Sequence, residues 1–361
     1  MTEDADLLAR AATIAPRFAI DGAVSMVEPH AGGHIHDSFV VTTPARRWFL
    51  QRMNTRVFQE PERVMDNIAA VTAFLARSAP RGDRALTTVR SGDGSWLARN
   101  ATGECWRMFE FLEGTVTRAT AANASDAQVT AHAFGEFQRR LAAYDGPQLH
   151  VTIPRFHDTE RRLRAFERAA RVDAHQRAKG AAESIAFALA RRALATTLAD
   201  AHMRGEAPRR IAHNDAKIAN ILFDETNGAP RCVVDLDTVM PGLSLYDFGD
   251  LVRSMVSPGA EDEPDLSRAR AEPDRFAAIV RGYRMGTEGL LTAAERRLLP
   301  AAAETIVYEQ GLRFLTDHLE GDSYYRITRP GQNLDRCRVQ FALLESLERQ
   351  RPVFARLTEH P

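Results

Sequence analysis

The chain has 361 residues, and its 47 Lys and Arg nearly balance its 48 Asp and Glu, which gives a formal net charge of −1. A balance this close to neutral offers no general electrostatic attraction for nucleic acid or for an anionic membrane, so we expect neither as a partner. The length predicts two packed units or one fold with two lobes.

The cysteines are widely spaced and form neither a Cys-x-x-Cys pair nor a dense framework, which is typical of a reducing compartment: Cys105, Cys232 and Cys337. Residues 1–18 are acidic in character and contain no long apolar run, and no later segment approaches the roughly 18 uninterrupted apolar residues of a membrane-spanning helix. We therefore expect a cytoplasmic protein. The sequence gives no indication of its oligomeric state.

Short runs of β-type composition separated by turns fill residues 23–112, among them SFVVTT, RWFLQRM and CWRMFEFL. One helix interrupts them at residues 61–77, where Pro61 opens the segment and apolar side chains recur with a helical period at Val64, Ile68, Val71 and Leu75. After residue 117 the chain is rich in alanine and helical in pattern, and short strands return only at about 211–239. We predict an α+β fold with two lobes, a small antiparallel-sheet lobe at 1–112 and a mostly helical lobe at 113–361.

The residues suited to chemistry are concentrated in IAHNDAKIANILFDETNGAPRCVVDLDTV, residues 211–239. Two apolar runs flank the turn DETNGAP, so the segment should form a hairpin that brings Asn220 near Asp235. Asp215 lies on the loop before the hairpin, two residues after His213. Phosphoryl transfer needs a carboxylate to orient and deprotonate an acceptor hydroxyl, and oxygen ligands to hold Mg²⁺. Asp215 suits the first role, and Asn220 with Asp235 suits the second.

The alternative is that Asp215 and Asn220 only cap turns by bonding to backbone amides. A second candidate for the metal ligand is Asp247, in YDFGD. The hairpin spacing decides against it, because Asp235 follows Asn220 by 235 − 220 = 15 positions and Asp247 by 247 − 220 = 27. Asp237 is two residues beyond Asp235 and, on an extended strand, would share its face as a second metal ligand or a supporting residue. We expect Asp247 to cap the following helix or to brace the loop of Asp215.

The runs HNDAKIANILFD, VVDLDTVMPG and YDFGD together resemble the aminoglycoside phosphotransferase and choline kinase superfamily, whose fold is protein-kinase-like. Further blocks, including GHIHDSFVVTT, FLQRMNT, WRMFEFLEGTV and GLRFLTDHLEGDSYY, are similar to the N-acetylhexosamine 1-kinases of that superfamily. The similar blocks run from about residue 18 to residue 345. The resemblance implies nucleotide binding in the first lobe, and catalysis with acceptor binding in the second.

For the nucleotide, Gly32 and Gly33 lie between two β-like runs, where absent side chains let backbone amides approach phosphate oxygens. A plain hairpin turn would look the same. The strand WFLQRMN offers Gln51 or Arg52 to the phosphates, and we choose Arg52 because it is cationic; its acidic helix partner would be Glu62 or Asp66. The joint MFEFLEG resembles the hinge whose backbone, from Glu110 to Leu112, bonds the edge of adenine.

For the acceptor, the resemblance implies contacts to a sugar from His34, Arg313, Asp317 and Tyr324. His34 and His36 also share a strand face, but no third ligand at a suitable spacing supports a zinc site. Glu309, Arg313 and Asp317 follow one another at four-residue intervals, so an internal salt-bridge ladder is an alternative. In FHDT, we expect Asp158 or Thr159 to act only as a helix cap.

The sequence therefore predicts an ATP- and Mg²⁺-dependent transfer of a phosphoryl group to the anomeric hydroxyl of an N-acetylhexosamine. An aminoglycoside or choline-like acceptor is the alternative among enzymes, although such cations usually meet a dense acidic patch and the polar residues here are mixed in sign. A nucleotide-binding scaffold without activity would be expected to lack at least one of three groups that this chain retains: Asp215, Asn220 and Asp235.

Overall fold

The computed structural model describes residues 3–30, 35–77 and 85–359. These residues form two compact units: unit 1 comprises Met1–Val116, Tyr144–Pro154 and Phe223–Met240, and unit 2 comprises Thr117–Ala143, Arg155–Leu222 and Pro241–Pro361. The predicted α+β class is confirmed, with an antiparallel sheet in the N-terminal region and helices in the C-terminal region. The units differ from two contiguous lobes, because two later segments of the chain pack within unit 1.

Unit 1 is built on an antiparallel sheet with the strand order β1-β2-β3-β6-β4, to which β5 adds by pairing with β6. The central pairing of β3 with β6 places Gln51 opposite Arg107 and Leu50 opposite Met108. The strands of this sheet are β1 (Met26–Pro29), β2 (Asp37–Thr42), β3 (Arg47–Arg52), β4 (Thr88–Val89), β5 (Ala98–Arg99) and β6 (Cys105–Glu110).

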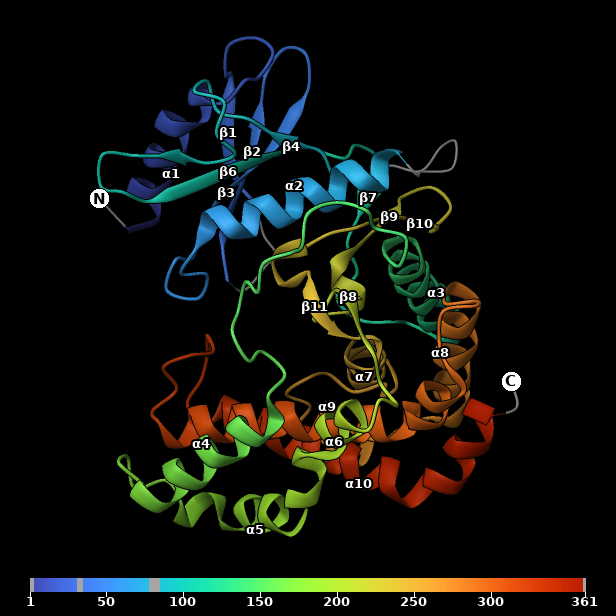
Figure 1. The fold of residues 1–361 in the computed structure, drawn as a ribbon. Helices are drawn as coiled ribbons and strands as arrows, with labels where there is room; N and C mark the ends of the chain where they lie inside the picture. Colours follow the sequence, from blue (N-terminus) through green and yellow to red (C-terminus); the bar gives the residue numbers. More distant parts are fainter. Residues whose placement is uncertain (1–2, 31–34, 78–84, 360–361) are drawn as a thin grey trace. The chain divides into compact units, whose positions relative to one another are not determined.

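Two helices accompany this sheet. The first, α1 (Glu3–Ile14), lies beside the sheet (Figure 1) and is followed by the 3-10 turn η1 (Ala15–Arg17). Both supply side chains to the core on one face of the sheet. Alternate strand residues meet them there, among them Phe39, Val41, Trp48, Leu50, Trp106 and Met108. The other helix, α2 (Pro61–Arg77), is the one that the apolar period predicted, and the side chains of that period are buried.

A smaller sheet has the order β10-β9-β7, with β7 (Thr115–Val116), β9 (Ile221–Asp224) and β10 (Pro230–Val233). The predicted hairpin is therefore present, and the Asp224 carboxylate accepts the N–H groups of Thr226 and Asn227 in its turn. The second strand is shorter than the sequence indicated. It ends at Val233, and Asp235 has a left-handed backbone (φ 59°) before the 3-10 turn η5 (Leu236–Thr238). The expectation that Asp235 and Asp237 share the face of one extended strand is wrong.

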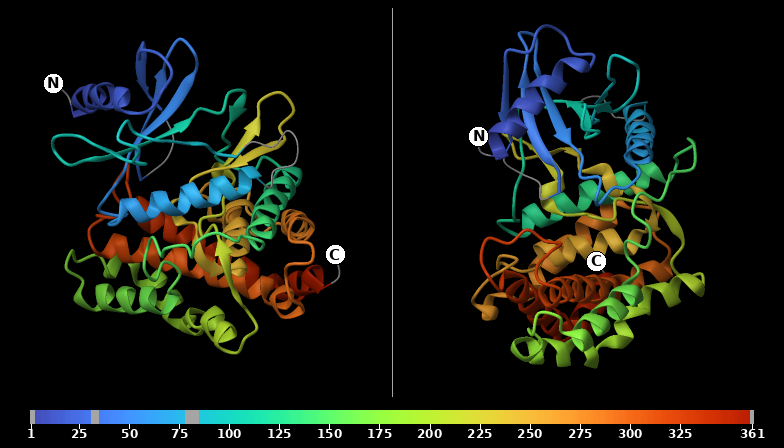
Figure 2. Two further views of the ribbon diagram at one scale, coloured as in Figure 1. Left: turned by 45° about the horizontal axis from the view of Figure 1, so that its top comes forward. Right: turned by 90° about the vertical axis from the view of Figure 1, so that its left-hand side faces the viewer.

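Unit 2 is mainly helical. Helix α3 lies along α8, and α9 along α10, in the views of Figure 2. A short pair of strands, β8 (Arg209–Ala212) and β11 (Met240–Leu243), precedes and follows the hairpin in the sequence. The helices are α3 (Ala124–Leu141), α4 (Thr159–Val172), α5 (Ala182–Ala190), α6 (Thr197–Met203), α7 (Ser244–Met255), α8 (Pro273–Gly286), α9 (Ala293–Leu319) and α10 (Gln332–Glu359).

Short 3-10 turns complete the structure: η2 (Lys179–Ala181), η3 (Arg192–Ala195), η4 (Ile218–Asn220) and η6 (Leu266–Arg268). No helix among the described residues combines the length and the apolar character needed to cross a bilayer.

Candidate active site

The loop between β8 and η4 holds Asp215 by contacts within unit 2. Lys217 Nζ lies 2.8 Å from Asp215 Oδ2. The side-chain amide of Asn220 donates to the same Oδ2 at 3.0 Å and to the Asp215 carbonyl at 2.9 Å. Because its NH₂ group faces Asp215, the Oδ1 atom of Asn220 points the other way, as a metal-binding oxygen would require. The predicted pairing of Asp215 and Asn220 on one loop is therefore seen.

The charge of Asp215 is set by its neighbours. Burial acts to raise the pKa of this carboxyl, but the positive charges of Lys217 and Arg253 hold its pKa well below the usual range. Arg253 belongs to α7 and is itself paired with Asp250, Nε to Oδ1 at 2.5 Å. Asp215 is therefore ionised at neutral pH and is able to accept a hydrogen bond from a hydroxyl group.

Asp247 braces this loop by accepting hydrogen bonds from its backbone. One carboxylate oxygen accepts the N–H of Asn214 at 2.7 Å, and the other accepts the N–H of His213 at 3.0 Å and the side-chain amide of Gln138. Asp247 lies inside the first turn of α7, and the cap position, Leu243, makes no side-chain cap bond. Of the two roles predicted for Asp247, the structure shows the brace. Burial outweighs these bonds and raises the pKa of Asp247.

The backbone of the same loop has an unusual conformation at Asn214, whose φ is 64°. Its side chain donates to the Ala212 carbonyl at 3.1 Å. Gly242 of β11 leaves the space for this side chain, because a Cβ at position 242 would overlap Asn214 Oδ1. The glycine of the run VMPG is thus needed for the shape of the loop that holds Asp215.

His157 is a second brace of this loop, and it bonds to a backbone carbonyl where Asp247 bonds to backbone N–H groups. His157 bonds through Nε2 to the Asn214 carbonyl and through Nδ1 to Glu309 Oε1, both at 2.9 Å. Burial acts to lower the pKa of His157, but the charge of Glu309 and these bonds raise it above the usual value. Because a carboxylate and a carbonyl are both acceptors, these contacts suit a protonated ring that donates from both nitrogens, and the ring joins α9 to the Asp215 loop.

The predicted helix cap next to His157 is confirmed. Asp158 caps α4 by accepting the N–H of Arg161 at 2.9 Å. Thr159 is the first helical residue, and its hydroxyl donates to Glu309 Oε2 at 2.5 Å.

Three of the four residues assigned to the acceptor lie in unit 2 but have different surroundings. Asp317 accepts the N–H groups of Ser323, Tyr324 and Tyr325 at 2.8–2.9 Å, so it shapes the loop after α9. Arg313 donates to Gln310 at 3.0 Å, and its guanidinium lies 5.5 Å from the Tyr325 ring. Tyr324 is 58% exposed. Since Glu309 bonds to His157 and Asp317 to its loop, the contacts differ from those of a salt-bridge ladder.

In unit 1, Asp237 is paired with Arg107 of β6. Arg107 Nη1 lies 2.6 Å from Oδ1 and Nη2 lies 2.7 Å from Oδ2, and each side chain is 2% exposed. His36 faces the same carboxylate at 3.4 Å. Burial acts to raise the pKa of Asp237, but the charges of Arg107 and His36 hold it well below the usual range. Both oxygens are engaged by a guanidinium, which suits the predicted supporting role better than metal ligation.

The choice between Gln51 and Arg52 follows from strand alternation. Arg52 lies between Asp37 (2.7 Å) and Glu104 (2.6 Å), and Glu104 also pairs with Arg10 of α1, so Arg52 is on the α1 side of the sheet. Gln51 is on the other side, where its Oε1 accepts two bonds from Arg107 at 2.8 and 3.0 Å. We therefore withdraw Arg52 as the cation for the phosphates.

Neither predicted acidic partner contacts Arg52 or Gln51 in the described structure: Glu62 pairs with Arg99, and Asp66 lies 4.0 Å from His150. At the joint, the N–H of Glu110 donates to the Thr87 carbonyl at 2.9 Å. An adenine contact at Glu110 would therefore use its carbonyl. Leu112 is buried, and its carbonyl accepts the Thr115 hydroxyl at 2.6 Å. Gly32, Gly33 and His34 lie outside the described residues.

The residues suit magnesium in chemistry but offer few carboxylates. Mg²⁺ prefers oxygen ligands and usually combines one or two carboxylates with phosphates and water. Asn220 and Asp235 supply such oxygens, and Asp237 is already neutralised by Arg107. Over the described ranges no group of three or more His, Cys, Asp and Glu side chains is arranged to hold a metal ion. A magnesium ion bound by either residue would thus depend on nucleotide phosphates for part of its coordination.

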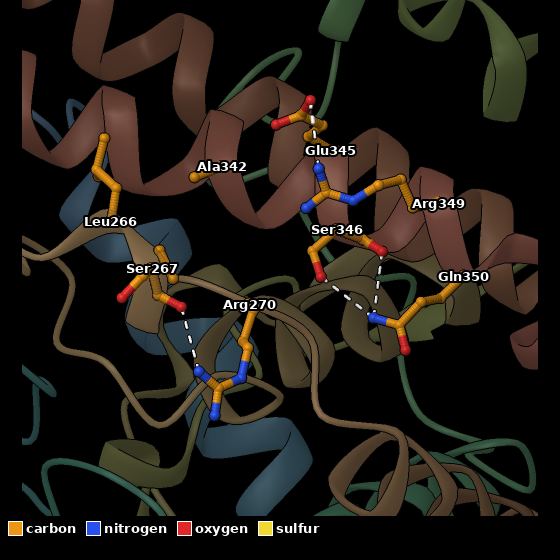
Figure 3. A pocket seen from close by; sticks show the side chains of 9 residues that line it. Leu266, Ser267, Arg270, Ala342, Glu345, Ser346, Arg349 and Gln350 are labelled. Carbon is orange, nitrogen blue, oxygen red and sulfur yellow. Dashed lines mark hydrogen bonds and ion pairs between the residues drawn. The ribbon is translucent and has the colours of Figure 1, made fainter.

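A separate surface groove of about 610 Å³ lies in unit 2 between η6 and α10 (Figure 3). Arg349 pairs there with Glu345 at 3.4 Å, and Gln350 donates to Ser346. None of its lining residues belongs to the Asp215 loop or to the acceptor candidates. We therefore do not assign the acceptor to this groove.

Sequence reasoning missed four charged residues of the candidate site: Arg107, His157, Lys217 and Arg253. For Arg107 a signal was present, because a single arginine inside the apolar run CWRMFEF must be buried with a partner. Lys217 was readable from its position two residues after Asp215. His157 and Arg253 depend on contacts between distant segments, and the sequence held no signal for them.

Comparison with known proteins shows the family and the fold of the chain. The phosphotransferase enzyme family (APH) matches residues 27–280, which is more than half of the chain. Among solved structures, a microcompartment-associated aminopropanol kinase is similar at 16% sequence identity, with a TM-score of 0.57 and 98% of each chain covered. A spectinomycin phosphotransferase in complex with ADP and spectinomycin is similar at 10% identity, with a TM-score of 0.59, covering 95% of this chain and 98% of that chain.

An aminoglycoside phosphotransferase from Alicyclobacillus acidocaldarius subsp. acidocaldarius is similar at 14% identity, with a TM-score of 0.53, covering 94% of this chain and 95% of that chain. Identities this low show a shared fold, which is that of the protein-kinase-like phosphotransferases. The family match extends over the strands of unit 1, the Asp215 loop and the hairpin that follows it. The chain therefore belongs to the phosphotransferase enzyme family.

Proposed function

We propose that this phosphotransferase moves the γ-phosphoryl group of ATP to the anomeric hydroxyl of an N-acetylhexosamine and so forms a sugar 1-phosphate. The observation that best supports an acceptor of this type is the state of the acidic side chains near the acceptor candidates. Glu309 is bonded to His157 and Thr159, and Asp317 to the loop after α9. The charge of Glu309 is balanced by His157, and both oxygens of Asp317 are engaged by N–H groups, which weakens the case for a cationic amine, whereas Arg313 and Tyr324 suit a neutral sugar with an acetamido group.

In the proposed reaction, Asp215 orients the 1-hydroxyl and accepts its proton. Two bonds converge on Oδ2, from Lys217 and Asn220, so we assign the proton to Oδ1. The low pKa of Asp215 makes it a weak base that takes the proton late, as suits a loose transition state with little bond formation to the acceptor. When bound, Mg²⁺ would neutralise charge on the phosphates, and Asn220 with Asp235 are the residues we propose to hold it.

The test is a panel of acceptors with ATP and Mg²⁺, in which nucleoside diphosphate and sugar phosphate are both quantified. We expect N-acetylglucosamine and N-acetylgalactosamine to be phosphorylated at the 1-position, and kanamycin and choline to react poorly. Efficient turnover of an amine without any sugar 1-phosphate would replace the sugar by an amino alcohol as the acceptor.

The same assay tests the base. Asp215→Asn keeps the shape of the side chain but removes the proton acceptor, so turnover should fall by about 10²- to 10⁴-fold while nucleotide binding is retained. A variant that keeps more than about a tenth of the wild-type turnover would remove Asp215 from this role.

A further inference from the structure

The segment that follows Asp235 is fixed within unit 1 by three different elements. Arg107 of β6 binds both carboxylate oxygens of Asp237 at 2.6 and 2.7 Å. Thr152 donates its hydroxyl to the Asp237 carbonyl at 2.7 Å. Asn67 of α2 donates to the Val239 carbonyl at 3.0 Å and is 1% exposed. The side chain of Asp237 and the main chain of residues 237–239, just after Asp235, are therefore both held.

Arg107 is held in turn by the sheet. Its Nε and Nη2 donate to Gln51 Oε1 on the neighbouring strand, and Gln51 donates to Ser38 at 3.0 Å. His36 accepts the Asn54 N–H at Nδ1 and places Nε2 3.4 Å from Asp237 Oδ1, the oxygen that Arg107 Nη1 also contacts. The guanidinium thus has one orientation, set by β2 and β3.

Stability alone is a poor explanation for so elaborate a buried pair. Taking two charges out of water costs several kcal/mol for each ion, and apolar residues of similar size are often equally stable in such places. Asp235, two residues before Asp237, has a left-handed backbone that is unfavourable for a residue with a Cβ. Such a conformation persists when its surroundings enforce it.

We propose that Arg107 is a positioning residue: through Asp237 it fixes the backbone of Asp235, and so the direction of the carboxylate that binds Mg²⁺. This inference rests on the proposed function, because it assigns Asp235 to the metal. On the face of the sheet away from α1, the buried cation is Arg107 of β6. Strand β3 has Gln51 on that face and Arg52 on the α1 side.

The test replaces the ion pair by an apolar pair, Arg107→Met with Asp237→Leu. Melting temperature, affinity for ADP with and without Mg²⁺, and amide exchange of residues 235–239 in the metal-free protein are measured. We expect a melting temperature near that of the wild type and unchanged ADP binding without Mg²⁺. The affinity for Mg²⁺ in the presence of ADP should fall by about 10- to 100-fold, as for lost supporting contacts of metal ligands, and amide exchange should become faster.

Arg191→Met with Glu348→Leu is the matched control, because this bidentate pair (2.8–3.0 Å) joins segments of unit 2 outside the candidate site. It should leave Mg²⁺ affinity unchanged. If the apolar double variant does not fold, Arg107→Lys serves instead: the charge is kept, the two-point contact is lost, and the KM for Mg²⁺ should rise about 10-fold with a smaller change in kcat.

Wild-type Mg²⁺ affinity and wild-type exchange at residues 235–239 in the double variant would overturn the inference, and so would an unchanged KM for Mg²⁺ in Arg107→Lys. A different result would count against the proposed function itself. If the wild-type protein binds ADP without any dependence on Mg²⁺, the assignment of Asp235 to the metal fails before any variant is compared.

Discussion

Two short acidic segments, VVDLDTV in unit 1 and YDFGD in unit 2, contain similar letters and have opposite surroundings. Asp235 leaves its strand in a left-handed conformation, and Asp237 meets the guanidinium of Arg107. Asp247 lies inside a helix and accepts N–H groups, two from the backbone and one from Gln138. The N–H groups that meet Asp247 make it a brace of the Asp215 loop, whereas the metal role of Asp235 is part of the proposed function.

The rest of YDFGD is explained in the same way. Phe248 is fully buried, and Gly249 allows α7 to approach α9, because a Cβ there would lie 2.7 Å from the Ala302 carbonyl. Asp250 pairs with Arg253. The run DFGD resembles a metal-binding motif, but its four residues are used in packing or in bracing within unit 2.

The largest expected effect is on activity, and it should distinguish Asp235 from Asp247. We expect Asp235→Ala to lower Mg²⁺-dependent turnover by at least about 10²-fold, since a metal ion contributes several kcal/mol to charge stabilisation. Its melting temperature should change little. The measurement is a Mg²⁺ titration of turnover beside a melting curve, and a variant with normal turnover at low Mg²⁺ would show that another residue is the ligand.

The second effect is on stability. Asp247→Ala leaves buried donors of His213, Asn214 and Gln138 without their acceptor, so the free energy of unfolding should fall by about 3 kcal/mol. Asp274→Ala, an exposed aspartate in the first turn of α8, is the control and should change it by less than about 0.5 kcal/mol. Equal denaturant midpoints for the two variants would contradict the brace.

A smaller loss of stability is expected when Gly249, which lies between Asp247 and Asp250 in YDFGD, is replaced by alanine. Gly249→Ala would bring a Cβ to 2.5 Å from Ile306 Cγ1, so overpacking should cost about 2 kcal/mol of unfolding free energy. Gly180→Ala is the control, because nothing lies within 4 Å of a Cβ there. If both variants unfold at the same denaturant concentration, α7 and α9 are less closely packed than the structure indicates.

The smallest effect concerns the second brace of the Asp215 loop and depends on pH. The pKa of His157 is raised on folding, so its stabilising contribution is complete below the unfolded value of about 6.5 and is lost as the pH rises through the folded value. His157→Gln should therefore cost about 1.5 kcal/mol at pH 6 and less at pH 9.

The control for this series is His175→Gln, at an exposed histidine. Unfolding free energies are measured from pH 6 to pH 9. A difference between His157→Gln and the wild type that stays constant over this range would mean that the ring is neutral in the folded protein.

Local patterns of the sequence predicted a large part of the fold. The helix at 61–77, the strands of unit 1 and the hairpin after Asn220 follow from periodicity and turn residues, which act over a few neighbouring positions. The same local spacing predicted that Asp215 and Asn220 would share one loop. It failed where a strand ended early, since nothing in VVDLD shows that Asp235 turns left-handed.

The element types, the loop of Asp215 and the phosphotransferase family can be predicted from the sequence, because each depends on short-range order along the chain. Which charges meet depends on how the chain folds: Arg107 pairs with Asp237, 130 positions apart, and Asp247 with the loop, 33 and 34 positions apart. The physical reason is that a buried charge is stable only beside a partner, and the partner is chosen by how strands and helices pack.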